Sequence, residues 1–253
     1  MRAIIFESTT GNAVDELEFT SCETDTGILA SDKITIDIPG YTPKAATMDL
    51  RKLLTPLKYG VAVQTADGRV PAAGIITAPP EASDDADGNH SYSITCYGPE
   101  KIIAGWSVRK YPGWPLVGSD RKPTGLYDVN ITGVQYGTMM KMLIQEAMKF
   151  SGAELPLFFE PSRAGTRQKS WEAIAGKSVM SAIDDIADLL GGVEYDFVPR
   201  IGSNDQVSWE FVTATDAVRE ISSAVTATWR LGGVSPDLKN FRRSSDPSSI
   251  VTE

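Results

Sequence analysis

Hydrophobic and polar residues alternate in short runs over the first 105 residues of the chain. The clearest run is Lys33–Ile38, in which the isoleucines point to one side of a strand and the residues between them point to the other. Pro39 and Gly40 end this run, and similar turn residues separate the others. Short strands at regular spacing predict a β barrel or sandwich over residues 1–105. We expect its core to include Ile34, Ile36, Val61, Val63, Ile75, Ile94 and Cys96.

One segment of this region predicts a helix instead. Residues Thr47–Leu54 place Met48, Leu53 and Leu54, and Leu50 in part, on one side, and Pro56 then stops the helix.

Residues 106–125 form a connector of different character. Prolines and glycines follow one another closely here, so regular structure is not expected. Four basic residues stand against the single acidic Asp120, and aromatic residues lie between them.

The second half of the chain predicts an α+β domain over residues 126–253. One helix is expected from Thr138, as N-cap, to Phe150, and a second follows the cap residue Ser178 and runs to Leu190. A hairpin follows, with strands at 193–198 and 207–212. The last residues, Ser249–Thr252, resemble the beginning of a strand, so the domain is either completed by another chain or truncated.

Charge and scarce residue types exclude several functions. The chain has 253 residues and a net charge of −9, which opposes binding to a nucleic-acid backbone. Its one histidine, His90, rules out a zinc site with several histidine ligands. Cys22 and Cys96 have no metal-binding spacing and are expected to be small buried strand residues. Neither a targeting segment nor a long apolar run is present, so we expect a soluble protein made in a reducing compartment.

Two motifs suggest a ligand and are better explained otherwise. Gly176-Lys177-Ser178 lacks the earlier glycine of a phosphate loop, because Trp171 occupies that position. The acidic run from Ser83 to Gly88 resembles a calcium loop, but Ile94 stands where the bidentate glutamate belongs. We therefore expect a helix entry and a solvated hairpin tip, with no cofactor and no metal.

Two carboxylate pairs could in principle hydrolyse glycosides without histidine: Asp184 with Asp188, and Glu194 with Asp196. The first pair lies on the polar face of a predicted helix, and the second on one face of a predicted strand. We expect no catalytic residue here, and the chain is not predicted to be an enzyme.

The connector contains the most unusual residues, Trp106, Arg109, Tyr111 and Trp114. Such residues often anchor protein interfaces. Packing between domains, and stacking on a glycan or nucleic acid, are the alternatives. We expect a subunit interface at these four residues and at Ile250.

The order of segments resembles the minor tail proteins of long-tailed phages, especially the tail-hub proteins of phages that infect actinobacteria. The residues that carry the resemblance are Ile34–Pro39, Val61–Arg69 with Ala73–Ile76, Tyr97–Ile103, Ala182–Ala187 before Gly191–Tyr195, Leu238–Phe241 and Asp246–Thr252. The resemblance implies a tail-tube-like β domain within a threefold hub ring that closes the tail tube.

The resemblance also implies partners and a location. Other copies of the chain, the distal tail protein, the tape measure and receptor-binding components would be its neighbours at the tail tip, after assembly in the host cytoplasm. DNA would pass without specific binding, because an acidic lining repels phosphate. A tail-associated cell-wall hydrolase using the paired carboxylates, and a glycan-binding β module using Trp106, Tyr111 and Trp114, are the alternative functions.

Overall fold

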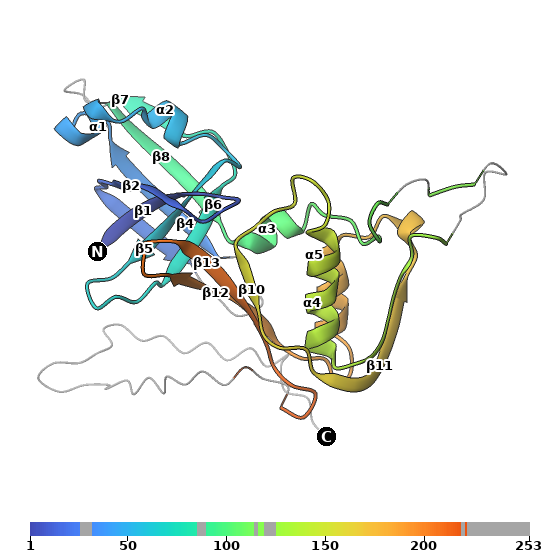
Figure 1. The fold of residues 1–253 in the computed structure, drawn as a ribbon. Helices are drawn as coiled ribbons and strands as arrows, with labels where there is room; N and C mark the ends of the chain where they lie inside the picture. Colours follow the sequence, from blue (N-terminus) through green and yellow to red (C-terminus); the bar gives the residue numbers. More distant parts are fainter. Residues whose placement is uncertain (26–31, 85–89, 114–115, 119–124, 219–220, 222–253) are drawn as a thin grey trace, which may run out of the picture. The chain divides into compact units, whose positions relative to one another are not determined.

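The computed structural model describes residues 1–25, 32–84, 90–113, 116–118, 125–218 and 221. They belong to one compact unit, Met1–Ile221. Its strands are β1 (Arg2–Glu7), β2 (Ala13–Leu17), β3 (Ser21–Asp25), β4 (Lys33–Pro39), β5 (Tyr59–Gln64), β6 (Ala72–Ile76), β7 (Glu81–Asp84), β8 (His90–Tyr97), β9 (Val129–Val134), β10 (Leu157–Phe159), β11 (Ala164–Trp171), β12 (Tyr195–Ile201) and β13 (Val207–Thr213). Its helices are α1 (Pro43–Thr47), α2 (Leu50–Leu53), α3 (Pro99–Ile103), α4 (Tyr136–Ala147) and α5 (Val179–Ala187), with a 3₁₀ turn η1 (Ala173–Ala175) (Figure 1).

The first half of the unit folds into one sheet of eight strands in the order β2-β1-β5-β6-β8-β4-β3, with β7 paired to β8. Alternation in β4 places its isoleucines on the core face, as the sequence predicts. The burial predicted for this region is confirmed, since each of these residues is at most 1% exposed: Ile34, Ile36, Val61, Val63, Ile75, Ile94 and Cys96.

The sheet is not a closed barrel in the described part of the chain. Its two ends are β2 and β3, which follow each other in sequence with only residues 18–20 between them. Such a short connection spans at most roughly 14 Å, so the ends of the sheet approach each other at this corner. The described residues of β2 and β3 nevertheless do not pair.

The helix predicted over Thr47–Leu54 is wrong in its extent: within this range only α2, Leu50–Leu53, is a helix, and α1 already ends at Thr47. Thr42 caps α1, and the Asp49 side chain caps α2 by accepting from Lys52 N at 3.3 Å. The new cap at Asp49 explains why the single helix is wrong. Leu54 is buried as predicted.

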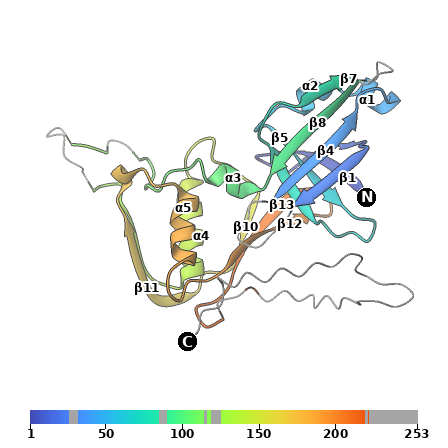
Figure 2. The ribbon, with the colours of Figure 1, turned by 180° about the vertical axis from the view of Figure 1, so that it is seen from behind.

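Helices α4 and α5 lie side by side, with β11 running beside them (Figures 1 and 2). The predicted bounds of α4 are each wrong by three residues, since Gln135 and not Thr138 is the N-cap and the helix ends at Ala147 and not at Phe150. The carboxylate of Asp216 accepts from Tyr136 N at 3.1 Å, and the hydroxyl of Thr138 accepts from Arg163 N. Ser178 caps α5 as predicted.

The predicted end of α5 is also wrong. The helix ends at Ala187, and Leu190, which the pattern places on the buried stripe, is 99% exposed. The left-handed φ of Gly191 turns the chain away, and Gly192 lies so close to Ala187 O that a Cβ there would stand 2.0 Å from it.

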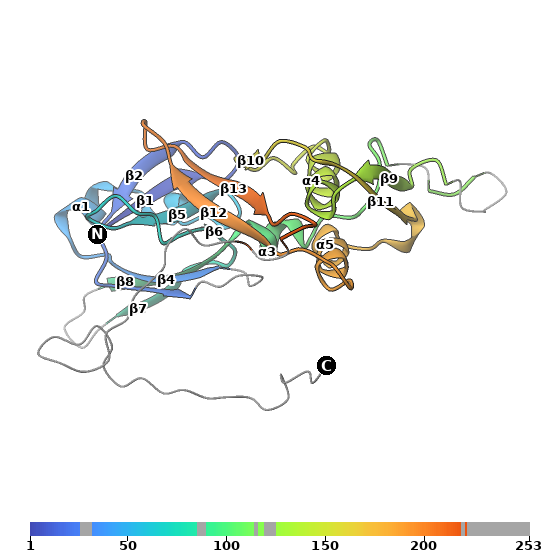
Figure 3. The ribbon, with the colours of Figure 1, turned by 90° about the horizontal axis from the view of Figure 1, so that it is seen from below.

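The predicted hairpin is present as β12 and β13, joined in parallel by β10. It lies against the first sheet near β1, β5 and β6 (Figure 3), where a second core forms between the sheet and the helices. Phe6, Ala62 and Ile75 contribute from the sheet, and Trp209 and Phe211 from β13. The proposed boundaries at residues 105 and 125 stay a prediction.

The sequence pattern does not predict α3 or the pair β9–β11. In the described part of the chain no helix is long and apolar enough to cross a membrane.

Candidate functional site

The connector packs on the C-terminal end of α4. The guanidinium of Arg109 lies 4.9 Å from the centre of the Phe150 ring, and the Tyr111 ring packs edge-on against the same ring at 5.4 Å. Tyr111 N donates to Glu146 Oε1 at 3.0 Å. The described connector residues are therefore held by aromatic contacts and hydrogen bonds rather than by regular secondary structure.

The predicted interface residues have different surroundings. Trp106 is half-buried against the second core, and its backbone oxygen accepts from Val179 N at 2.8 Å. Tyr111 remains 57% exposed. Trp114 and Ile250 lie outside the described residues.

A recess of about 180 Å³ opens beside these residues. Trp106, Arg109, Phe150, Gly152 and Ala153 are among the residues that line it. The recess combines aromatic surface with one cation, which is the composition of an interface anchor site.

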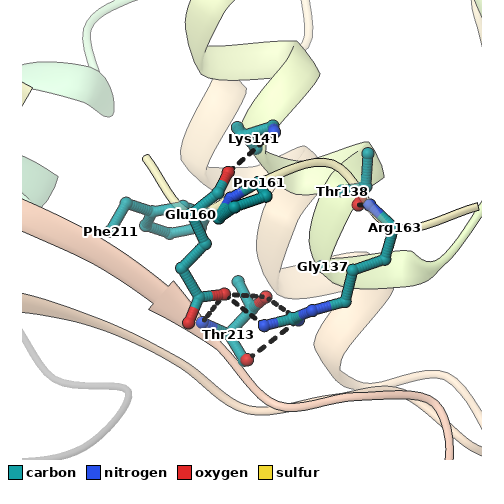
Figure 4. A pocket seen from close by; sticks show the side chains of 8 residues that line it. All are labelled: Gly137, Thr138, Lys141, Glu160, Pro161, Arg163, Phe211 and Thr213. Carbon is teal, nitrogen blue, oxygen red and sulfur yellow. Dashed lines mark hydrogen bonds and ion pairs between the residues drawn. The ribbon is translucent and has the colours of Figure 1, made fainter. Parts of the chain in front are cut away.

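A second cluster, the α4 polar cluster, consists of Lys141, Glu160, Arg163 and Thr213 (Figure 4). Lys141 Nζ donates to Glu160 O at 2.9 Å and to Ser162 Oγ at 2.6 Å. Burial lowers the pKa of Lys141, and the nearby Arg163 charge lowers it further. The cluster thus fixes the segment before β11 on α4.

Arg163 extends this cluster to the end of β13. Its guanidinium donates to Thr213 O at 3.2 Å and to Ala214 O at 3.3 Å, and it pairs with Glu160 Oε2 at 2.5 Å. The remaining space is about 10 Å³, about enough for one water molecule. These groups hold backbone segments together and leave no room for a substrate.

The four carboxylates considered for catalysis are also engaged in local structure. Asp184 accepts from the Tyr195 hydroxyl at 2.6 Å, and Asp188 is the C-cap of α5. Glu194 accepts from Ile221 N at 2.8 Å, and Asp196 from Phe197 N at 2.8 Å. Burial, together with the bond to Asp184, raises the pKa of Tyr195.

Glu100, at the start of α3, is a titratable residue that the sequence pattern does not single out. Burial raises its pKa to about 8, and the charges of Asp32 and Asp196 act in the same direction. Burial also raises the pKa of Asp196. The only sequence signal is an acid directly after Gly98-Pro99, which is typical of any helix start.

The Gly176–Ser178 motif has a local role, whereas Asp85–Gly88 of the acidic motif lie outside the described residues. Lys177 pairs with Asp185, and the Ser178 hydroxyl accepts from Ser181 N at 3.1 Å, as a helix entry requires. His90 Nδ1 lies 2.5 Å from Asp84 Oδ1. Among the described residues no group of acidic, histidine or cysteine side chains is arranged to hold a metal. Cys96 is buried as expected, but Cys22 is only half-buried, and both are free thiols on strands that β4 separates.

The sequence matches no protein-family model and no curated protein sequence. Its fold is similar to that of several solved structures, and the three described next are each less than 15% identical to this chain. One is the c3393 protein of E. coli, a component of the type VI secretion system with structural similarity to the T4 tail proteins gp27 and gp5. It is 10% identical with a TM-score of 0.43, and the match covers 76% of this chain and 46% of that one. The tail protein of Neisseria meningitidis MC58 is 14% identical with a TM-score of 0.43, over 83% and 50%.

The 43 kDa tail protein of prophage MuSo2 from Shewanella oneidensis is 10% identical with a TM-score of 0.44, over 82% of this chain and 53% of that one. The chain therefore spans about half the length of these structures.

Proposed function

We propose that this chain is a structural component of a phage tail tip, a hub subunit that closes the tail tube and anchors receptor-binding or wall-degrading parts. The support comes from the resemblance of its sequence segments to tail-hub proteins and from the use of its polar groups. Lys141, Glu160 and Arg163 bind backbone or one another, and Asp184 binds the Tyr195 hydroxyl, so these polar groups stabilise the fold.

The observation that carries the proposal is the way Tyr111 is held. An exposed tyrosine on a loop normally loses conformational freedom when it binds a partner. Tyr111 is already fixed by the Phe150 ring and by the bond from its backbone N to Glu146, while its side chain stays 57% exposed. A rigid, exposed aromatic residue beside a recess is a typical interface anchor.

In this proposal the partner at the connector is another copy of the chain, in a ring that is threefold as in the resembling family. The distal tail protein, the tape measure and the receptor-binding components are its other neighbours. The chain keeps the three segments predicted from sequence, 1–105, 106–125 and 126–253, and acts in the virion at the tail tip.

Sedimentation of the full chain over a range of concentrations tests the proposal. Tyr111→Ala should weaken self-association by about tenfold or more, the range of an interface anchor. Tyr41→Ala is a matched control, because Tyr41 is also 57% exposed. A wild-type protein that stays monomeric at high concentration, or equal behaviour of the two variants, would contradict the proposal.

Incubation of the same protein with purified cell walls distinguishes an enzyme from a structural subunit. The proposal predicts no release of soluble fragments. Release that Glu194→Gln abolishes in a folded protein would replace it with a wall-degrading function, and quenching of Trp fluorescence by sugars would indicate a glycan-binding module.

A further inference from the structure

The strands at the ends of the two larger sheets differ in how their outer backbone groups are used. β2 and β3 are the two ends of the strand order of the first sheet, and β12 is one of the two end strands of the sheet of β10, β13 and β12. An end strand exposes unpaired N–H and C=O groups, to which another strand can be added. Hydrogen bonds from the neighbouring strands show which residues face outward.

On β12 the outward donors in the middle of the strand are used or absent. Trp209 N donates to Pro156 O, so the backbone groups of Trp209 face the β10 side and not β12. Pro199 lies opposite Trp209 on β12, and its backbone therefore faces away from β13, toward the open edge. Pro199 has no N–H, and the outward N–H of Phe197 donates to Asp196 Oδ1 at 2.8 Å. The middle of this edge therefore offers no donor to an added strand.

On β2 a similar contact is present. Ser8 N donates to Lys58 O, so even-numbered residues of β1 face β5, and Glu16, opposite Ile4, faces the open side. Glu16 N donates to Asp15 Oδ1 at 2.7 Å. The preceding aspartate thus occupies the outward donor on both β2 and β12.

On β3 the outer groups are open. Gly40 N donates to His90 O at 2.8 Å, so even-numbered residues of β4 face β8 and odd-numbered residues face β3. Glu23, opposite Thr35, therefore faces β4, and Cys22 and Thr24 face outward. Within the described residues neither the N–H of Cys22 nor that of Thr24 has a hydrogen-bond partner.

Side chains on β3 restrict which strand can be added. Glu23 and Asp25 are exposed on one face of the strand, and half-buried Cys22 lies on the other face, against the buried isoleucines of the first sheet. A second copy of β3 would place its own Glu23 and Asp25 beside these acids, and like charges on neighbouring strands are destabilising. A strand with Lys or Arg at alternate positions and small apolar residues between them satisfies both faces.

We propose that the open edge of β3 docks an extended basic segment of another protein, which joins the sheet as a further strand. Backbone groups at Cys22 and Thr24 supply the affinity, and the charges of Glu23 and Asp25 select the segment. This surface is separate from the connector, so the proposal does not depend on a tail function.

Binding of short labelled peptides to the full chain, followed by fluorescence anisotropy, tests it. The probe is a peptide in which Lys and Val alternate, and its counterpart carries Glu in place of Lys. Thr24→Pro removes an N–H that the sheet does not use, so the fold should persist while binding of the Lys/Val peptide weakens about tenfold. Thr24→Val keeps the N–H and should bind like the wild type.

Charge reversal and peptide methylation give independent readouts. The double variant Glu23→Lys, Asp25→Lys should prefer the Glu/Val peptide. A Lys/Val peptide N-methylated at alternate valines should not bind the wild type, and this comparison remains decisive if Thr24→Pro does not fold. The proposal would be overturned if the wild type did not bind the Lys/Val peptide. It would also be overturned if the methylated peptide bound as tightly as its parent, because charge alone would then explain the affinity.

Discussion

Phe6 of β1 and Trp209 of β13 pack edge to face, with ring centroids 5.7 Å apart and an interplanar angle of 66°. Both side chains are fully buried, although they come from opposite ends of the described chain. This contact joins the first sheet to the core that the helices share.

We expect Trp209→Ala to lower the free energy of unfolding by about 3 to 5 kcal/mol, because it empties a large buried site. A double-mutant cycle with Phe6→Leu, measured by urea unfolding, should give a coupling of about 0.5 to 1.5 kcal/mol. Additive effects of the two substitutions would contradict a direct contact.

Glu100 should make the stability of the protein depend on pH. Its pKa in the folded protein, about 8, lies above the ordinary value of 4.5, so the folded state holds the proton more tightly. The stabilisation is complete below pH 4.5 and is lost as the pH rises toward and through 8, with a slope of up to about 1.4 kcal/mol per pH unit.

Glu100→Gln should reduce this loss, so the variant gains stability relative to the wild type as the pH is raised from 5 to 8. Urea unfolding at several pH values measures the effect. Glu172→Gln, at an exposed position, is the control and should follow the wild-type curve. Parallel curves for the Glu100 variant and the wild type would be inconsistent with a buried, protonated carboxyl.

The core of the first sheet could be predicted from sequence because strand alternation is a local property. Ile34 and Ile36 are buried by the period of two residues, whatever strand pairs with them. In contrast, β11 reads Ala-Gly-Thr-Arg-Gln-Lys-Ser-Trp, without an apolar face, and forms only because Val129–Val134 lies beside it. Nothing local indicates that pairing.

The α4 polar cluster could not be predicted for the same reason. Lys141, Arg163 and Thr213 come from a helix, a loop and a strand, and only the tertiary fold brings them together. Lys141 also occupies a buried helical position, where a sequence pattern predicts an apolar residue. The connector was recognisable because its composition is unusual, but its contact with Phe150 was not.

Leu57 has a left-handed backbone, with φ of 61°, and its side chain is 61% exposed. This conformation costs a residue other than glycine about 1 to 2 kcal/mol, and little apolar burial offsets it. Leu57→Gly should therefore leave the free energy of unfolding unchanged or raise it by up to about 1 kcal/mol. The thermal midpoint measures the effect and should not fall. Leu190→Gly, at a position without a left-handed backbone, should not raise it.

Arg163 should not be replaceable by lysine. Its planar guanidinium reaches Thr213 O, Ala214 O and Glu160 together, and a lysine ammonium on a flexible stem cannot reproduce that fork. Because the two carbonyl groups would lose their donor, Arg163→Lys should lower the free energy of unfolding by about 1 to 3 kcal/mol. Arg69→Lys is the control, since the Arg69 side chain is 80% exposed, and should change it by no more than about 0.5 kcal/mol. Equal effects of the two substitutions would mean that the contacts of Arg163 do not stabilise the end of β13.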